Sequence, residues 1–493
     1  MPLKTPQEYV DSLRAMKIRA YIGGERVSSI VDHPGVAPHI NTVAKTYELA
    51  HKPEYKAIMT ATSHLTGQTI HRYTHIFQSA DDLVKKIEML RLLGQTTGTC
   101  FQRCVGLDAA NATYAISYEA DQKHGTDYHE RFKKYLIGIQ NDDLMVAGAM
   151  TDPKGHRAKR PAEQDDPDQF VRVVERRDDG VVIRGAKLHN TGGINSHEIL
   201  VLPGTAMKDD EKDYAIACAV PADAEGVIFI FGRQSNDTRK FEGGCQDYGN
   251  SRFGVVGGEA MIVFEDVFVP NERIFLNGET DQCGKMVTYF ATWHRANYGG
   301  CKAGNADVLI GATAKTTRIL GTEKNGIVRD KLIEMVHLTE TTYGTAVAAS
   351  FKGYPLPCGS FMVDPMLANV TKQNITRNVY DIGRLAHDLA GGFLATMPGE
   401  DEFNHPEIGD YVKKYHVANP QYDVMERVKM GRYIEAMTSV TTLVEAMHGA
   451  GSPQAQRIVM GMGADIDKKI AMAEKVINGD DDVPGLPLRG KRT

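Results

Sequence analysis

The spacing of apolar residues changes twice along the chain, and this change constrains the fold more than any other feature. Up to about residue 143 apolar residues recur with the helical period, as in 43–50, 83–93, 109–122 and 128–139. Short β-like runs follow to about residue 278, and long helical stretches then return. The order helix, strand, helix predicts an α+β chain rather than alternating βαβ units.

The three zones predict three domains, because 493 residues exceed what one hydrophobic core usually serves. We expect a helical domain over 1–143, a β-domain over 144–278 and a helical domain over 279–493. At the start, Thr5-Pro6-Gln7-Glu8 has the form of a capping box and predicts a helix towards Met16. Residues 21–27 predict a small hairpin.

Strands and helices can be placed within the last two zones. The runs 170–174 and 181–183 flank Asp178-Asp179-Gly180, which is a strong hairpin signal. The evenly spaced strands favour a barrel or a sandwich, and the further runs lie at 199–202, 214–220, 227–231 and 261–268. The expected C-terminal helices cover roughly 302–321, 327–350, 364–392, 422–447 and 453–477.

Composition narrows the classes of function. The chain is 42% hydrophobic and 24% charged with a net charge of −6, and it has no basic block, so nucleic acid is not expected as a partner. Neither a secretory signal nor a membrane span is expected, because no apolar stretch approaches 18 residues. Seven scattered cysteines indicate a reducing cytoplasm rather than a disulfide framework.

Two short segments hold four soft or borderline metal ligands. Cys100 and Cys104 are four residues apart, and His294 and Cys301 are seven apart. On a helix either spacing returns to one face, and a Cys₃His set suits zinc or an iron–sulfur cluster. Two cysteines at this spacing are, taken alone, more often buried helix residues. The residues between the second pair include Gly299-Gly300, which predicts close backbone approach to a cluster or substrate, or else a helix end.

Several longer runs carry a resemblance to a known family; they lie at 31–34, 100–106, 148–155, 258–260, 298–302, 372–377 and 447–454. They resemble the 4-hydroxybutyryl-CoA dehydratases, a branch of the 4-hydroxyphenylacetate hydroxylase family whose fold is similar to that of the acyl-CoA dehydrogenases. The resemblance spans essentially the whole chain. The hydroxylases of the family lack the cysteine set, whereas the dehydratases carry it.

The resemblance implies two cofactors and a reaction. Cys100, Cys104, His294 and Cys301 would bind a [4Fe–4S] cluster in which the histidine-bound iron acts as a Lewis acid. FAD would take an electron from the substrate enolate and so acidify an otherwise inert β C–H bond. The implied activity is dehydration of 4-hydroxybutyryl-CoA to crotonyl-CoA, with vinylacetyl-CoA isomerisation beside it.

The resemblance also implies roles for five side chains. His294, displaced from iron, would accept the α-proton, Tyr298 would transfer a proton or bind the hydroxyl, and Lys302 would hold charge near the flavin or carbonyl. Glu259 and Glu445 resemble an acidic pair of the family, with Glu445 as the acid/base of isomerisation. Without the resemblance, a buried helix tyrosine is mostly packing and a lone glutamate mostly surface.

Flavin contacts are expected in five segments. One segment would come from a neighbouring subunit, which predicts a homotetramer built as a dimer of dimers. The expected residues are Arg103, then Met150, Thr151, Lys154 and His156, then Thr191, Gly192 and Asn195, then Gly391 and Gly392 from the neighbour, and finally Gly451, Ser452 and Gln454.

Two other functions remain open at this point. A flavin-dependent monooxygenase acting on a phenol would need no cluster, and iron content separates it from a dehydratase. A non-catalytic assembly protein stapled by zinc would hold zinc without iron or flavin.

Overall fold

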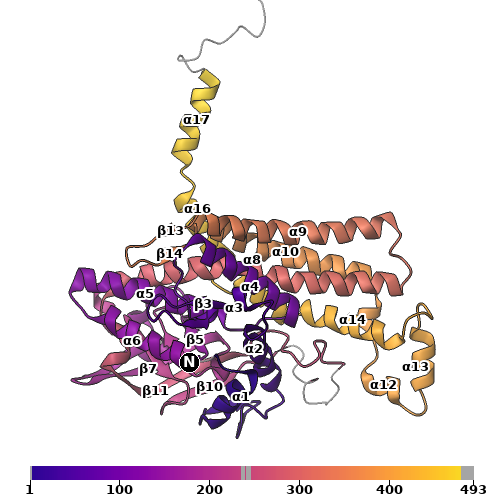
Figure 1. Ribbon diagram of the computed structural model, residues 1–493, viewed down its shortest axis with the longest axis horizontal. Coiled ribbons are helices and arrows are strands. Elements are labelled where there is room, and N and C mark those ends of the chain that lie inside the picture. Colours follow the sequence, from indigo (N-terminus) through magenta and orange to yellow (C-terminus); the bar gives the residue numbers. More distant parts are fainter. Residues whose placement is uncertain (1–2, 235–238, 240–245, 479–493) are drawn as a thin grey trace, which may run out of the picture.

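In the computed structural model, which describes residues 3–234, 239 and 246–478, the sheets gather at one end of the molecule and three long helices run across the other (Figure 1). The expected mixture of helix and sheet is confirmed. The C-terminal helix projects from the body beyond α16 (Figure 1). Among the described residues, no helix is long and apolar enough to cross a membrane.

The N-terminal elements follow the sequence pattern closely. Helix α1 (Pro6–Ala15) begins at the expected capping box, where Thr5 and Glu8 bond each other's backbone, and it ends at Met16. The hairpin is also confirmed, because β1 (Ala20–Ile22) pairs antiparallel with β2 (Glu25–Arg26). The expected helices are α2 (Ala37–Ala50), α4 (Ala80–Thr97), α5 (Cys104–His124) and α6 (Tyr128–Asn141). Apolar periodicity did not predict α3 (Lys56–Met59) or the pair β3 (Thr60–Thr62) and β4 (Thr69–His71).

Two sheets form the β region. The larger has the order β2-β1-β10-β11-β7-β6, and β1 from the N-terminal hairpin joins β10 in parallel. Its remaining strands are β6 (Arg172–Arg177), β7 (Gly180–Thr191), β10 (Val227–Phe231) and β11 (Glu259–Pro270). The expected turn at Gly180 joins β6 to β7.

The smaller sheet has the order β12-β9-β8-β5, with β5 (Val146–Ala149) parallel to β8 (Glu198–Val201). Its other strands are β9 (Ile216–Pro221) and β12 (Ile274–Asn277). The smaller sheet contacts the larger one where β5 meets β7. The expected arrangement of these strands as a barrel or a sandwich stays a prediction.

Three long helices form the core of the C-terminal region: α8 (Thr280–Ile319), α9 (Gly326–Phe351) and α10 (Pro365–Ala390). The expected start of the first helix near residue 302 is wrong, because α8 continues through Gly299 and Gly300. Packing against α4, α9 and α10 outweighs the intrinsic cost of two glycines in a helix interior, about 1 kcal/mol each. A helix end at these glycines is therefore excluded.

The last two expected helices are each divided. The first becomes α14 (Val424–Met437) and α15 (Val440–His448), because Ser439 caps a new helix by accepting from the backbone of Thr442. The second becomes α16 (Pro453–Gly463) and α17 (Ile466–Asn478). Between α10 and α14 lie the short helices α11 (Phe393–Thr396), α12 (Glu400–Asn404) and α13 (Gly409–His416).

Glycines let α8 lie directly against its neighbours. A Cβ on Gly299 would stand 2.3 Å from the Cβ of Ala346 in α9, and one on Gly300 would stand 2.6 Å from the carbonyl oxygen of Ile87 in α4. One turn further, a Cβ on Gly304 would meet the oxygen of Arg91 at 2.2 Å and the Cα of Gly94 at 2.9 Å. The close approach expected of these glycines is real, but it is to other helices.

We predict opposite effects for two substitutions in α8. Gly304→Ala should destabilise the protein by about 1–3 kcal/mol, because the added methyl group has no room against α4. Gly311→Ala, in the same helix, meets nothing within 4 Å and should stabilise the protein by about 0.5–1 kcal/mol through helix propensity. Thermal unfolding measures both, and a stabilising Gly304→Ala would contradict the close contact.

Candidate active site

The first pair of cysteines lies where α4 gives way to α5. Gly98 ends α4 in the left-handed conformation, and Cys104 is the first residue of α5. Cys100 lies in the connection between them, where Gln102 has a positive φ of 70°. The expectation that Cys100 and Cys104 share one helical face is therefore wrong. His294 and Cys301, by contrast, both belong to α8, as predicted.

The three thiols form one electrostatic group although they come from distant parts of the chain. Burial raises the pKa of Cys104 well above its ordinary value, and the charges of Cys100 and Cys301 raise it further. Burial likewise raises the pKa of Cys301 to about 11. All three thiols also raise the pKa of the phenol groups of Tyr73 and Tyr298. These raised pKa values keep the thiols protonated unless a positive partner, such as a metal, stabilises the thiolate form.

His294 is held on both faces and at one nitrogen. Its ring stacks on Phe290 at 5.3 Å and meets the ring of Tyr298 edge-on at 5.7 Å. Its Nδ1 lies 2.8 Å from Oδ2 of Asp108. Among the described residues no hydrogen bond is found at Nε2, which makes this nitrogen the candidate ligand atom.

The candidate ligands are not gathered around a point where a single metal ion would lie. In the part of the chain that the structure describes, no three His, Cys, Asp or Glu side chains converge closely enough to hold one metal ion. A structural zinc requires four converging ligands. Thiolates and an imidazole are ligand types that an iron–sulfur cluster takes, with each iron bound to a separate protein ligand.

A second buried group lies beside His294. Tyr298 donates to Oε1 of Glu445 at 3.1 Å, and Lys302 forms a very short ion pair with the other carboxylate oxygen. Lys372, fully buried in α10, lies over the ring of Tyr298 with Nζ 3.7 Å from the ring centroid. Its ammonium also donates to the carbonyl oxygens of Ala446 and Met447, so it fixes the end of the helix that carries Glu445.

The two candidate carboxyl groups have opposite environments. Burial raises the pKa of Glu259 to about 8, although a hydrogen bond from Thr191 at 2.7 Å opposes the rise. Burial alone would also raise the pKa of Glu445, but the ammonium groups of Lys302 and Lys372 outweigh it and lower that pKa. Near neutral pH Glu259 is therefore mostly protonated and Glu445 is a carboxylate. Such a divided pair suits acid and base roles.

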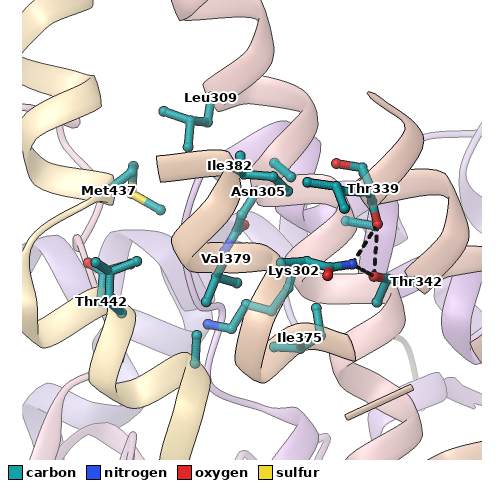
Figure 2. A pocket seen from close by; sticks show the side chains of 16 residues that line it. Lys302, Asn305, Leu309, Thr339, Thr342, Ile375, Val379, Ile382, Met437 and Thr442 are labelled. Carbon is teal, nitrogen blue, oxygen red and sulfur yellow. Dashed lines mark hydrogen bonds between the residues drawn. The ribbon is translucent and has the colours of Figure 1, made fainter. Parts of the chain in front are cut away.

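An apolar cavity adjoins this group, as Figure 2 shows. It has a volume of about 50 Å³, lies between α8, α9, α10, α14 and α15, and is partly open to solvent. Lys302 forms one wall, and the other labelled side chains are Asn305, Leu309, Thr339, Thr342, Ile375, Val379, Ile382, Met437 and Thr442.

The structure places the expected flavin residues in different surroundings. Arg103 is enclosed: its guanidinium lies between the rings of Tyr47 and Tyr73, at 4.2 and 4.8 Å from their centroids. It also donates to Thr46 at 3.0 Å. The approach of Arg103 to a flavin stays a prediction.

The segment after β5 and the end of β7 lie beside each other. The carbonyl oxygen of Thr151 accepts from the backbone of Leu188, and that of Met150 accepts from Lys187. Lys154 has a φ of 72°, and burial lowers its pKa. His156 is exposed and bonds Gln164 through its backbone.

The remaining expected contacts divide between the interior and the surface. Gly192 donates its backbone N–H to Gly258, and the side chain of Asn195 donates to Tyr9. Gly391 and Gly392 lie exposed at the end of α10, with open space around both. Gly451 precedes Ser452, which caps α16, and the exposed Gln454 follows.

Sequence reasoning missed several residues of this site, above all Asp108. Asp108 lies one helical turn after Cys104, and this spacing could have predicted that the two residues share a helical face. Sequence reasoning also missed Lys86, Asn297 and Lys372. A lysine in an apolar helix can be predicted to be buried only if its partner is known, and the partners of these lysines belong to other helices.

Comparison with known proteins places the chain in a family. Residues 5–276 match the 4-hydroxyphenylacetate 3-hydroxylase N-terminal family, and residues 283–478 match its C-terminal counterpart. The two matches together cover nearly the whole chain, which is therefore a member of the 4-hydroxyphenylacetate 3-hydroxylase family.

Within that family, the chain resembles dehydratases more than hydroxylases. It is 50% identical to a 4-hydroxybutyryl-CoA dehydratase/vinylacetyl-CoA-Δ-isomerase of Clostridium aminobutyricum, over 96% of this chain and 99% of the relative. A 4-hydroxyphenylacetate 3-monooxygenase oxygenase component of a Geobacillus strain is 27% identical over 88% of this chain and 87% of that protein.

Among the solved structures, too, a dehydratase is more similar to this chain than a hydroxylase. An oxygen-tolerant archaeal 4-hydroxybutyryl-CoA dehydratase from N. maritimus has a TM-score of 0.95 and 45% identity, covering all of this chain and 98% of that one. The oxygenase component of 4-hydroxyphenylacetate 3-monooxygenase complexed with FAD has a TM-score of 0.83 and 22% identity, covering 96% and 99%. The latter likeness shows the fold alone.

Proposed function

We propose that the protein is a lyase that dehydrates 4-hydroxybutyryl-CoA to crotonyl-CoA and also isomerises vinylacetyl-CoA. The proposal is supported by the three thiols, whose charges raise the pKa of Cys104 and of Tyr298, and by the contact between the rings of His294 and Tyr298. The names of the relatives at 45–50% identity support the same substrate.

The proposed cofactors are a [4Fe–4S] cluster held by these four ligands and FAD held near β7. When bound, the cluster would supply a Lewis-acidic iron and the flavin a one-electron acceptor. The exposed backbone at Gly391 and Gly392 would contact the flavin of a neighbouring copy, and this sharing underlies the proposed homotetramer. We place the enzyme in the cytoplasm, because a cluster of this type needs reduced thiols.

The protein's own groups would supply positioned proton transfer. Burial raises the pKa of Tyr298 well above its ordinary value, and the nearby Glu445 carboxylate raises it further, so the phenol is a donor. Its hydroxyl would hold the departing 4-hydroxyl or give it a proton, while Glu445 accepts protons during isomerisation. Glu259, protonated and bonded to Thr191, would face the same substrate as an acid. Lys302 would keep Glu445 ionised and in place.

Removing one ligand should release iron without unfolding the protein. We expect Cys301→Ala to lose cluster iron and dehydratase activity, because a proposed iron ligand is removed. The variant should keep its flavin, because Cys301 is not one of the proposed flavin contacts. Cys283→Ala removes another buried thiol of α8 and should keep both iron and activity. Iron and flavin analysis after anaerobic purification measures the outcome. Wild-type iron content and turnover in Cys301→Ala would refute the ligand assignment.

Colour separates the proposed lyase from a hydroxylase of the same family. A purified dehydratase should be brown, with broad visible absorbance that air bleaches, and should form crotonyl-CoA anaerobically. A yellow or colourless protein that instead hydroxylates a phenol, given reduced flavin and oxygen, would select the alternative.

Tyr298→Phe should slow turnover much more than it weakens substrate binding, because the hydroxyl acts in the transition state. Loss of a positioned proton donor predicts a fall in kcat of about 10²- to 10⁴-fold with little change in KM. Tyr289→Phe is the matched control, because Tyr289 lies in the same helix as Tyr298. Its hydroxyl donates to Glu119 of α5 at 2.8 Å and should be dispensable for turnover. Equal kcat values for the two variants would exclude a catalytic role for the Tyr298 hydroxyl.

A further inference from the structure

Asp108 joins the elements that carry the four proposed ligands. It is fully buried in α5, one turn after Cys104. Its Oδ2 lies 2.8 Å from Nδ1 of His294 and also accepts a very short hydrogen bond from the side-chain amide of Asn297, both in α8. A single carboxylate oxygen thus connects the helix of Cys104 to the helix of His294 and Cys301.

The hydrogen bond to Asp108 selects one form of the imidazole. A carboxylate oxygen only accepts hydrogen bonds, so Nδ1 of His294 must carry the proton. The lone pair is then on Nε2, which is the nitrogen without a hydrogen bond to any described residue. A neutral imidazole with its proton on the far nitrogen is the form that binds a metal. Asn297 donates to the same carboxylate oxygen and so helps to hold it beside the ring.

A buried lysine supplies the charge that this carboxylate needs. Nζ of Lys86, in α4, lies 3.6 Å from Oδ1 of Asp108, and both side chains are fully buried. The ammonium also lies over the ring of Phe77, 4.5 Å from its centroid. An isolated buried carboxylate or ammonium would be very costly, so each keeps the other in the interior. Lys86 and Asp108 have no contact with solvent, and neither has a part in the proposed reaction described above.

We infer that Asp108 is a positioning residue that fixes the orientation and tautomer of His294 for iron, and that Lys86 holds Asp108 in place as a carboxylate. This inference rests on the proposed function, since it requires His294 to be a ligand. It adds a residue outside the four ligands on which retention of the cluster depends. Outer hydrogen-bond partners of this type commonly change metal affinity by about 10- to 100-fold.

Two variants test the inference in the holoenzyme. Asp108→Asn removes the charge and leaves Lys86 buried without its partner, so it can also unfold the protein. Lys86→Met/Asp108→Leu removes the hydrogen-bond acceptor and the ammonium together and leaves an apolar interior, which should fold. Asp82→Asn is the control: Asp82 pairs with Arg72 and with His75, a similar arrangement that touches none of the four proposed ligands.

The readouts are the rate of iron release to a chelator and the electron paramagnetic resonance spectrum of the reduced cluster. We expect the folded double variant to release iron about 10- to 100-fold faster than the wild type and to show an altered spectrum. Asp82→Asn should release iron at the wild-type rate. A merely structural role for Asp108 would change the melting temperature and leave the spectrum unchanged.

Two results would overturn the inference, and they are distinguishable. If the wild type holds the cluster and the folded double variant shows the same release rate and spectrum, Asp108 does not position His294, and the proposed function stands. If the anaerobically purified wild type holds no iron, the proposed function fails and the inference fails with it.

Discussion

The close contact between α4 and α8 is the constraint on which the site depends. At Gly94, Gly300 and Gly304 the two helices approach until their backbones touch, and no side chain larger than hydrogen fits between them. This contact sets the distance from the end of α4, which leads to Cys100, to the middle of α8, which carries His294 and Cys301. Gly299 makes the corresponding approach to α9 on the other side.

The site that this packing creates contains several buried or partly buried ionisable groups. Lys86, Asp108, Lys302, Lys372 and Glu445 all lie in or beside it, and each is opposed by a group of the other sign or by backbone carbonyls. Buried charges contribute little to stability compared with well-packed apolar residues. Their retention here therefore points to chemistry, and the opposite pKa directions of Glu259 and Glu445 are one result of it.

Local signals in the sequence identified most of the elements, and their failures have a physical cause. The capping box at Thr5, the turn at Gly180 and the period of apolar residues act over a few residues, so α1, the β6–β7 hairpin and α9 appear close to their expected bounds. The start of α8 was misplaced because glycine disfavours a helix locally, whereas three neighbouring helices favour it. The single long helix expected over 422–447 was divided because a serine cap offers its hydroxyl to a new helix. The three-domain division stays a prediction.

By itself, the sequence determined which residues have the chemistry of the site: three cysteines and a histidine at helical spacings, a tyrosine one turn from that histidine, and glycines inside an apolar helix. Only the tertiary structure decided how these residues meet. In the tertiary structure Cys100 lies outside the helix that contains Cys104. Asp108 contacts His294, and Lys372 lies over the ring of Tyr298. Spacing along one helix reports which residues share a face, but hydrogen bonds and ion pairs between helices depend on how closely those helices pack, and here backbone contacts between distant glycines set that distance.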